Sequence, residues 1–362
     1  MVQTQNAAST RIAILLEDQF EDSEFQVPYT ALLQAKARVM VIGTRMNDEY
    51  QGQQGNVSHK PDATTTEVRA EDFDAIVIPG GGAPDKIRTN PQAIQLVTEA
   101  MNAGKLVAAV CHGPQVLIEA DLLRDQRVTG FQAIRKDIEN AGGQYIDEPV
   151  VTDSNLITAR CPSDLPMFTT AILQELGLTI PGRPLPMTTD HTYAWWELGE
   201  LWQGSNRQDI LNALNTAIVG ERYTLAAFQK YGEQATNVEF RVTIQEVIAT
   251  KQRHVELLEN RLQEMGETVT WQAMGSEPFA ALQSWLQSSD DESLLRRAIG
   301  DLQTGAVDAL RLSIKLTDPQ TTELLKQLSD NLQRQIERSG DLYRTLWGIA
   351  VKPPLPTTMT MG

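Results

Sequence analysis

The sequence predicts two domains of different class, an α/β domain built on a parallel sheet and, after it, an all-α helical bundle. Residues 11–178 alternate between apolar, β-rich runs and segments with helical periodicity, which is typical of a parallel sheet covered by helices on both faces. From about residue 205 strand-like runs almost disappear and long helical segments follow. The predicted boundaries are 1–180 for the α/β domain, 181–205 for a linker with a tryptophan-rich part, 206–350 for the bundle and 351–362 for a flexible tail.

The α/β domain is expected to add strands and helices in turn. Continuous runs of Val, Ile, Leu and Ala indicate strands that are buried on both faces. Such runs lie at residues 11–16, 38–44, 73–82, 105–111 and 156–161. Helical periodicity fills residues 27–36, 90–104 and 113–123. The second of these helices has Asn90 as its N-cap and Pro91 at its first position.

Four helical segments of similar length are predicted in the second half. They lie near residues 206–235, 238–266, 290–317 and 319–347. The breaks after the first and third segments are short, which favours antiparallel neighbours, whereas residues 267–289 form a crossover. The segment before the bundle contains Trp195, Trp196 and Trp202, which are expected to pack one domain or subunit against another.

Composition and charge restrict the classes of function. With 362 residues, of which 41% are hydrophobic and 22% charged, the chain has the material of a globular protein with two cores. The formal charge of -16 argues against nucleic acid and against anionic membrane surfaces as partners. No apolar run approaches the roughly 18–20 residues of a membrane-spanning helix. Only two cysteines and a polar N-terminus without a secretory signal predict a cytoplasmic protein without disulfides.

The stretch KLVAAVCHGPQVL, residues 105–117, carries a chemical signal. A buried strand runs into Cys111, His112 and Gly113, and a helical pattern begins directly afterwards. This strand–turn–helix is a nucleophile elbow, which exposes the sulfur, and the unpaired N–H groups at the start of the helix favour its thiolate. We therefore expect Cys111 to be a reactive thiol with a lowered pKa.

Three consecutive glycines, Gly80, Gly81 and Gly82, end the run at residues 73–82. Their N–H groups can approach a substrate oxygen closely, and with the N–H of His112 they form a candidate oxyanion hole. The loop after the first strand, EDQFEDSEF, brings a carboxyl group to the same edge of the sheet. Ligands of parallel sheets bind beyond the carboxyl ends of the strands, so the site is expected at this edge.

Several motifs in this half resemble the DJ-1/PfpI superfamily, in its PfpI-like branch of intracellular proteases and stress proteins. They are EDQFEDSE, VIPGGGAPDKIR, VAAVCHGPQVLIEADLL and IENAGGQYIDEPVVTDSNLITARCPSDLP, in this order. The resemblance implies a flavodoxin-like, class I glutamine amidotransferase-like domain. It also implies Cys111 as the nucleophile, His112 beside it, and Glu21 hydrogen-bonded to the sulfur. Peptidase, glyoxalase III-like and protein deglycase activities are assigned to members of this superfamily.

One position departs from the peptidase pattern. Peptidase-type members carry a glutamate after the AP of the glycine-rich turn, which orients the histidine across a subunit interface, and this chain has Asp85 there. A carboxylate that is one methylene shorter can still orient His112, but the peptidase interpretation is weakened. Cys161 is expected to be structural. The acidic neighbours of Glu21 are expected to be solvated: Glu17, Asp18 and Asp22.

The second half resembles ferritin-like domains in its four-helix layout. Such domains place one Glu on each of two helices and a Glu-x-x-His pair on each of the others, and Glu221 and His254 match two of these positions. The other expected ligands are replaced, by Lys251, Gln303, Ile336 and Ser339. Because a cation at position 251 repels a metal ion, we predict no metal and no cofactor. Instead, Lys251 is expected to neutralise Glu221 as an internal ion pair.

These observations support three hypotheses for the function. The first is a cysteine-dependent hydrolase or lyase of the deglycase or glyoxalase III type, acting on a small carbonyl or glycated substrate. In it Cys111 attacks the carbon and Glu21 moves protons, while the N–H groups of Gly81 and His112 stabilise the oxyanion. The second is a peptidase or amidase with a Cys111–His112–Asp85 arrangement. The third is a redox-sensing stress protein in which Cys111 is oxidised. In each case the bundle is expected to serve association into a homo-oligomer, a dimer or larger.

Overall fold

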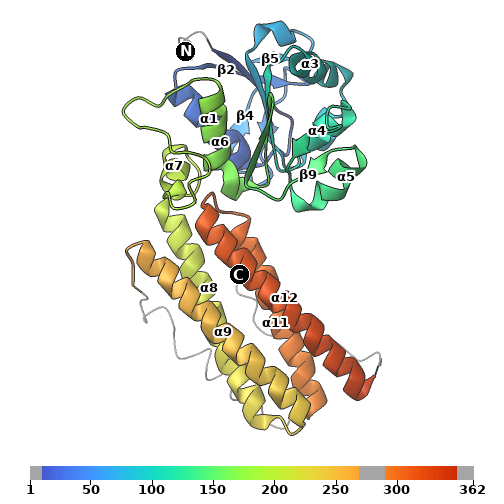
Figure 1. The fold of residues 1–362 in the computed structure, drawn as a ribbon, viewed down its shortest axis with the longest axis vertical. Coiled ribbons are helices and arrows are strands. Elements are labelled where there is room, and N and C mark those ends of the chain that lie inside the picture. Colours follow the sequence, from blue (N-terminus) through green and yellow to red (C-terminus); the bar gives the residue numbers. More distant parts are fainter. Residues whose placement is uncertain (1–9, 269–289, 349–362) are drawn as a thin grey trace. The chain divides into compact units, whose positions relative to one another are not determined.

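The computed structural model describes residues 10–268 and 290–348, which form two compact units (Figure 1). The first unit extends to Asn206 and includes Thr317–Pro319, and the second comprises Arg207–Leu316 and the residues from Gln320 onwards. Nearly all of the predicted crossover and the whole of the predicted tail lie outside the described residues. No helix within the described ranges combines the length and the apolarity needed to cross a membrane.

The first unit is built on a seven-stranded sheet in the order β10-β11-β7-β6-β1-β2-β5. Neighbouring strands run parallel, except that β10 and β11 pair antiparallel at one edge. The strands are β1 (Arg11–Leu15), β2 (Arg38–Gly43), β5 (Ala63–Thr64), β6 (Ala75–Ile78), β7 (Leu106–Val110), β10 (Val150–Asp153) and β11 (Leu156–Ala159). The mostly parallel sheet confirms the predicted fold class.

Helices cover both faces of this sheet (Figure 1). Helices α1 (Asp22–Gln34) and α6 (Leu165–Glu175) contact each other on one face, and α3 (Pro91–Asn102) and α4 (Pro114–Glu119) contact each other on the other. Because both faces are covered, all five residues of β7 are buried, which explains its continuous apolar sequence. The remaining elements are short: α2 (Ala83–Ile87), α5 (Arg135–Asn140), α7 (Trp195–Leu201), η2 (Ala70–Asp72), η3 (Gln132–Ile134), η4 (Pro162–Asp164), and the strand pairs β3 (Tyr50–Gln51) with β4 (Ser58–His59) and β8 (Arg127–Val128) with β9 (Gln144–Tyr145).

Residues 181–205, expected to be a linker, pack as part of the first unit. Helix α7 contacts α6, and the side chains of Trp195 and Trp202 are buried in the same core as the sheet. The end of this segment is tied down by a reciprocal pair of bonds. The N–H of Ser205 donates to Thr317 Oγ1 at 2.8 Å, and the N–H of Thr317 donates to Ser205 Oγ at 3.0 Å. Two of the three tryptophans of this segment therefore belong to the core of the first unit, a role that the sequence analysis did not predict.

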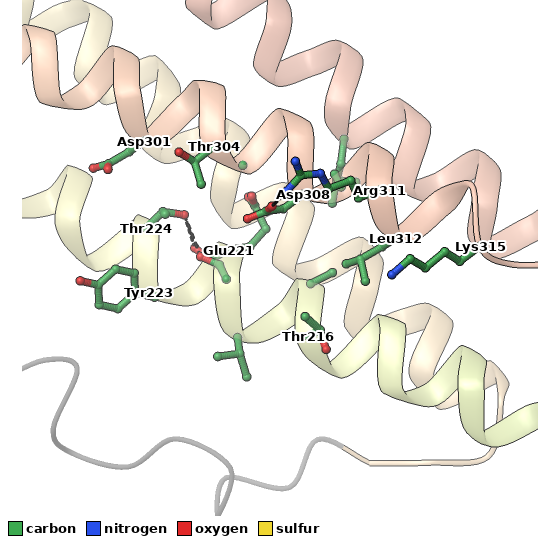
Figure 2. A pocket seen from close by; sticks show the side chains of 16 residues that line it. Thr216, Glu221, Tyr223, Thr224, Asp301, Thr304, Asp308, Arg311, Leu312 and Lys315 are labelled. Carbon is green, nitrogen blue, oxygen red and sulfur yellow. Dashed lines mark hydrogen bonds and ion pairs between the residues drawn. The ribbon is translucent and has the colours of Figure 1, made fainter. Parts of the chain in front are cut away.

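In its described residues, 207–268 and 290–348, the second unit has four long helices. They are α8 (Arg207–Gln234), α9 (Val238–Glu264), α11 (Asp291–Ser313) and α12 (Pro319–Trp347), close to the predicted segments. Two helices begin at side-chain caps: Asn237 accepts the N–H of Phe240 at 2.9 Å, and Asp290 accepts the N–H of Ser293 at 2.8 Å. Apolar side chains such as Phe228 fill the core between the helices. A cavity of about 500 Å³ remains between α8 and α11, and Figure 2 shows the side chains that line it.

Candidate active site

The turn after β7 holds Cys111 in a strained conformation. Its φ angle is 60°, in the left-handed region that residues other than glycine rarely adopt. Bonds on both sides fix it, because the N–H of Cys111 donates to Ala159 O at 3.0 Å and its carbonyl accepts the N–H of Phe131 at 2.9 Å. Helix α4 begins directly afterwards at Pro114, with Gly113 as its N-cap. The predicted strand–turn–helix is thus present, and backbone strain of this kind gathers at functional sites.

The carboxyl group beside the sulfur belongs to Glu24, not to Glu21. Glu24 is 0% exposed, and its Oε2 accepts the N–H of Gly80 at 2.7 Å. A Cβ atom added to Gly80 would lie 2.6 Å from Glu24 Oε2 and 2.9 Å from the Cβ of Cys111. The carboxyl and the cysteine therefore close around the same glycine from two sides. Among the described residues Glu24 Oε1 is buried without a hydrogen-bond partner, so this oxygen remains available for proton transfer.

Glu21, three residues before Glu24, caps helix α1 instead. Its Oε2 accepts the hydroxyl of Ser23 at 2.6 Å and the N–H of Glu24 at 2.9 Å, which makes it the N-cap of α1. The prediction that Glu21 bonds the sulfur is therefore wrong, because its carboxylate is turned back onto its own helix. Sequence reasoning missed Glu24 because its position in the first turn of α1 depends on where that helix begins.

The acid–base properties of Cys111 also differ from expectation. Burial raises the pKa of its thiol well above the usual value, and the nearby Glu24 and Cys161 raise it further. The predicted low-pKa thiol is contradicted for a physical reason. Cys111 is only 7% exposed, and α4, with six residues, offers a weak counter-charge. Burial, followed by the charge of Glu21, likewise raises the pKa of Glu24 well above its usual value.

Two of the four predicted oxyanion donors already make hydrogen bonds within the described residues, and the other two do not. The N–H of Gly80 is taken by Glu24, and the N–H of Gly82 donates to Gln19 O at 2.7 Å. For the N–H groups of Gly81 and His112, no acceptor lies within the described part of the chain. Of the four candidates, only Gly81 and His112 can therefore receive a developing oxyanion without breaking an existing bond.

His112 contacts the sulfur directly, whereas Asp85 stays at a distance. The Nδ1 atom of His112 lies 3.4 Å from Cys111 Sγ, and its ring packs on that of Phe131. Burial lowers the pKa of His112, and the charge of Asp85 opposes this. The Asp85 side chain is 72% exposed and lies 3.9 Å from Arg88, and within the described residues it makes no hydrogen bond to His112. Within one chain Asp85 therefore acts on the histidine through its charge, and its action across a subunit interface stays a prediction.

Cys161 lies at the same edge of the sheet, after β11. Its Sγ is 3.2 Å from Ser163 Oγ and 3.8 Å from Asp164 Oδ2, and the residue is buried. The two cysteines are not joined by a disulfide. A thiol that is packed among polar groups at the start of η4 has the environment of a structural residue.

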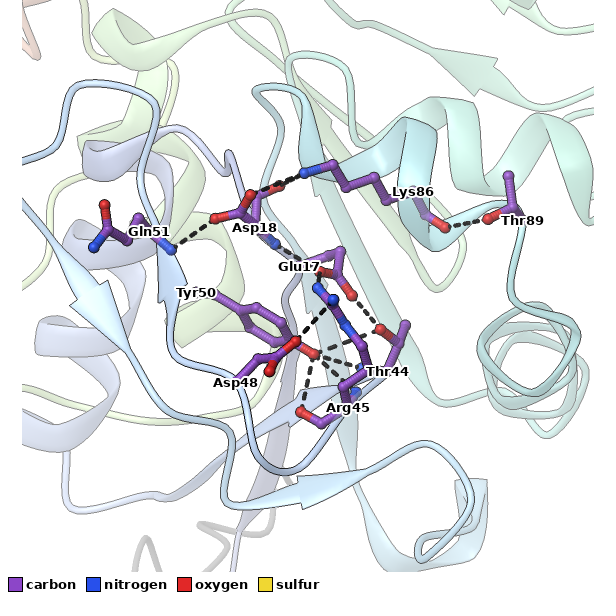
Figure 3. Close-up of polar contacts among 9 residues, drawn as sticks. All are labelled: Glu17, Asp18, Thr44, Arg45, Asp48, Tyr50, Gln51, Lys86 and Thr89. Atoms are coloured by element: carbon purple, nitrogen blue, oxygen red, sulfur yellow. Dashed lines mark hydrogen bonds and ion pairs between the residues drawn. The ribbon is translucent and has the colours of Figure 1, made fainter.

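The acidic neighbours of Glu21 are not all solvated, which corrects the expectation (Figure 3). Glu17 is buried, bonds the hydroxyl of Thr44, and pairs with Arg45 at 2.7 Å. Asp22 is also buried and accepts the N–H groups of three loop residues at 2.8–2.9 Å: Gln54, Asn56 and Val57. Only Asp18 is partly exposed, and it pairs with Lys86 at 3.0 Å. These carboxylates brace the loops at the carboxyl edge of the sheet, near the first turn of α1, which carries Glu24.

The polar group in the second unit confirms the predicted ion pair. Lys251 Nζ lies 3.1 Å from Glu221 Oε1, and His254 Nδ1 lies 3.0 Å from Glu221 Oε2. Burial raises the pKa of Glu221, but Lys251 and His254 outweigh it, and the net shift is downward. Gln303, taken as a ligand position, is exposed and does not face the core. Among the described residues, no group of three or more His, Cys, Asp or Glu side chains is arranged to hold a metal ion.

Comparisons with known proteins place these observations in a family context. The model of the DJ-1/PfpI family matches residues 10–175. Over 170 residues, which are 47% of this chain and 99% of the relative, the sequence is 39% identical to Protein/nucleic acid deglycase 2 of Escherichia coli (strain K12). Over 160 residues, 44% of this chain and 94% of the relative, it is 42% identical to the putative cysteine protease YraA of Bacillus subtilis (strain 168).

Both units are similar to those of one solved structure. A two-domain protein from Anabaena variabilis, containing DJ-1/ThiJ/PfpI-like and ferritin-like domains, is 48% identical with a TM-score of 0.92. The similarity covers 97% of this chain and 99% of that chain. The helical unit thus corresponds to the ferritin-like domain of that protein, as the four-helix layout indicated.

Proposed function

The chain belongs to the DJ-1/PfpI family, and from this premise we propose that its first unit is a cysteine-dependent enzyme acting on small carbonyl compounds or on glycated groups, of the deglycase or glyoxalase III type. One observation carries the proposal. Cys111 shares a buried edge with the carboxyl group of Glu24, and the open N–H groups of Gly81 and His112 lie at the same edge. This arrangement provides a nucleophile, a proton carrier and two oxyanion donors.

The raised pKa values of Cys111 and Glu24 suggest how the first step proceeds. Burial favours the protonated form of both groups, so the sulfur attacks as its proton leaves. A C–S bond forms to the carbonyl carbon of an aldehyde, the S–H bond breaks, and the C=O π bond opens towards oxygen. Glu24 accepts the thiol proton on one oxygen and releases its own proton from the other to the new alkoxide. The product is a neutral hemithioacetal, and no buried charge has to be created in the resting enzyme.

The names of the relatives support this proposal without selecting one activity. The Escherichia coli relative is named a deglycase and the Bacillus subtilis relative a putative cysteine protease, at similar identity. The contact between Cys111 Sγ and His112 Nδ1 favours a peptidase as the second candidate. Against it, burial raises the pKa of the Cys111 thiol, whereas the nucleophile of a cysteine peptidase has an ion-pair setting that lowers it.

A substrate panel tests the proposal. Methylglyoxal, a methylglyoxal-treated amine and casein are offered to the wild type, to Cys111→Ala and to Cys161→Ala, which removes the other buried thiol as a matched control. We expect turnover of the carbonyl substrates that is lost in Cys111→Ala and kept in Cys161→Ala. Casein cleavage that depends on Cys111, without carbonyl turnover, would establish the peptidase instead. If all substrates are inert and mild peroxide adds oxygen to Cys111 in the intact mass, the redox-sensor hypothesis replaces both.

A further inference from the structure

The two cysteines of this chain follow neighbouring strands of the sheet. Strands β7 and β11 pair in parallel with Val110 opposite Ala159, and Cys111 and Cys161 come directly after this pair of strands. The N–H of Cys111 still donates to Ala159 O at 3.0 Å, so the pairing continues as far as the first cysteine. Cys161 is one residue beyond the position opposite Cys111. Since paired strands lie about 4.8 Å apart and rise about 3.3 Å per residue, this register places the two Cα atoms about 5.8 Å apart.

The unusual backbone of Cys111 turns its side chain to the face on which Cys161 lies. In a regular strand Cys111 and Arg160, which stands opposite it, would share one face of the sheet, and Cys161 would lie on the other. The φ angle of Cys111 is 60°, which differs by about 180° from that of a parallel strand. A half-turn about the N–Cα bond moves the Cβ atom to the other face. Both cysteine side chains therefore lie on the same face.

The helices on this face confirm the orientation of both residues. Cys161 is the N-cap of η4, which leads directly into α6, and its Sγ lies 3.8 Å from Asp164 Oδ2. The Cβ of Cys111 and the carboxyl group of Glu24 on α1 both crowd Gly80. Helices α1 and α6 contact each other on one face of the sheet. Both sulfurs thus belong to the layer between the sheet and these two helices.

The two thiols also influence each other electrostatically. After burial and the charge of Glu24, a charge on Cys161 is the next cause that raises the pKa of the Cys111 thiol. Such an influence falls off with distance and is strongest in a buried setting. The two residues are 7% and 5% exposed, and neither is joined in a disulfide. Cys161 packs as a structural residue in the reduced protein, but its sulfur is also the nearest thiol to the nucleophile.

We propose that Cys161 closes a reversible disulfide with Cys111 when the protein meets a hydroperoxide. Disulfides join residues whose Cα atoms are about 4.4–6.8 Å apart, and the strand register places this pair inside that range. The backbone of each cysteine is already fixed, because Cys111 is bonded on both sides and Cys161 O accepts the N–H of Asp164 at 3.0 Å. The bond masks the nucleophile and prevents its irreversible oxidation to sulfinic acid. It can form whether or not Cys111 also acts on carbonyl compounds.

The chemistry balances with a hydroperoxide as the oxidant. The sulfur of Cys111 attacks hydrogen peroxide, an S–O bond forms and the O–O bond breaks, and Glu24 passes the thiol proton to the leaving hydroxide, which departs as water. The sulfur of Cys161 then attacks the sulfenic sulfur, the S–S bond forms, the S–O bond breaks, and the second thiol proton leaves with the hydroxide as water. Two electrons pass from the sulfurs to the peroxide. An external dithiol reverses the bond by exchange and is itself oxidised.

The intact mass of the full chain after treatment with hydrogen peroxide tests the proposal. We expect the wild type to lose two hydrogen atoms and to regain them with dithiothreitol. Cys161→Ala has no second thiol, so Cys111 should instead gain oxygen in a form that dithiothreitol does not remove. A wild type that gains oxygen as the variant does overturns the proposal. A disulfide between Cys111 residues of two chains, found by peptide mapping, overturns it as well, and so does a mass that millimolar peroxide leaves unchanged.

Labelling with iodoacetamide makes the protection quantitative. After peroxide and then dithiothreitol, we expect about tenfold more labelled Cys111 in the wild type than in Cys161→Ala, because sulfinic acid is not reduced. Ser163→Ala removes the hydroxyl 3.2 Å from Cys161 Sγ but keeps both thiols, and this control should behave as the wild type does. If Cys161→Ala unfolds at a lower temperature, Cys161→Ser replaces it. Equal labelling of the wild type and the folded variant contradicts the proposal.

Methylglyoxal turnover separates this proposal from the proposed function. If both are right, peroxide abolishes turnover in the wild type and dithiothreitol restores it, whereas the loss in Cys161→Ala is permanent. A reversible disulfide in a protein without carbonyl turnover would support the bond and contradict only the carbonyl activity. Carbonyl turnover in a protein that forms no disulfide would have the opposite meaning.

Discussion

Glu24 in the first unit and Glu221 in the second are both nearly inaccessible to solvent, at 0% and 6% exposure, yet their pKa values shift in opposite directions. Burial, followed by the charge of Glu21, raises the pKa of the Glu24 carboxyl. Burial also raises the pKa of Glu221, but Lys251 and His254 outweigh it, and its pKa falls. Burial alone therefore does not decide the charge of a carboxyl group. A paired cation reverses the effect of burial, and it separates a group that can carry a reactive proton from one that serves packing.

Removing the proton carrier should have the largest effect. We expect Glu24→Gln to lower carbonyl turnover by about 10²–10⁴-fold, because the amide cannot accept the thiol proton. Glu21→Gln is the matched control, since it loses a helix cap worth about 1 kcal/mol but leaves the proton path intact. Steady-state kinetics with methylglyoxal measure the loss of turnover in each of the two variants. Equal losses of turnover would show that the two carboxyls are not distinguished in the way described.

Removing one partner of the buried ion pair of Lys251 and Glu221 should lower the stability of the second unit. Lys251→Met leaves Glu221 buried without its cation, and we expect it to destabilise the helical unit by about 3–5 kcal/mol. Adding Glu221→Gln should restore most of this loss. The exposed pair of Lys230 and Glu233, at 2.7 Å, provides the control, with at most about 1 kcal/mol expected for Lys230→Met.

Hydrogen exchange of the α8 and α9 amides in urea reports the stability of this unit separately. A single variant Lys251→Met that is as stable as the double variant would contradict the pairing.

The dependence on pH should have opposite sign at the two glutamates. Above the usual value of 4.5, unfolded Glu24 is ionised while the folded group keeps its proton, so its contribution to stability falls as pH rises towards the folded pKa. Glu221 is the reverse, because its stabilising contribution is present above 4.5 and is lost as pH falls through its lowered folded pKa. The stability of each unit should therefore change with pH in the direction expected for its own glutamate.

Substitution separates the two contributions. Glu24→Gln should stabilise the first unit at pH 7 and have little effect at pH 4. Glu221→Gln should destabilise the second unit more at pH 7 than at pH 3. Urea unfolding with amide exchange in α1 and α8 at each pH measures both. The same slope for the two variants would refute the comparison.

The smallest effect is expected at Asp85. Because its side chain is 72% exposed, its influence on the ring of His112 is screened. Asp85→Asn should lower the pKa of His112 only slightly, as followed by NMR titration, and change kcat/KM for methylglyoxal less than about threefold. A loss of catalysis comparable to that in Glu24→Gln would instead indicate that Asp85 orients the histidine, as the peptidase hypothesis requires.

The elements of the fold could be predicted because they depend on local patterns. Buried strands such as β7 are continuous apolar runs, and each of the long helices has its own periodicity. The buried pair of Glu221 and Lys251 could also be predicted, since both belong to regular helices whose facing positions follow from spacing. The choice between Glu21 and Glu24 could not, because it depends on where α1 begins, and that boundary shifts a side chain by one turn.

The pKa of Cys111 was missed for another reason. A sequence shows the helix that follows a cysteine, but not the 7% exposure of the residue or the carboxyl group packed beside it. Likewise, Trp195 and Trp202 looked like contacts between domains, because a proline-rich stretch precedes them. Their burial in the first unit depends on tertiary packing onto α6, which periodicity does not reveal.

The crowding around Gly80 has a consequence for how this site can vary. A methyl group there would meet Glu24 Oε2 at 2.6 Å, the backbone nitrogen of His112 at 2.8 Å and the Cβ of Cys111 at 2.9 Å. One added carbon would therefore displace proton carrier, oxyanion donor and nucleophile together. In a library randomised at this codon and selected for activity, glycine alone should be recovered. At Asp85, in the first turn of α2, many codons should survive.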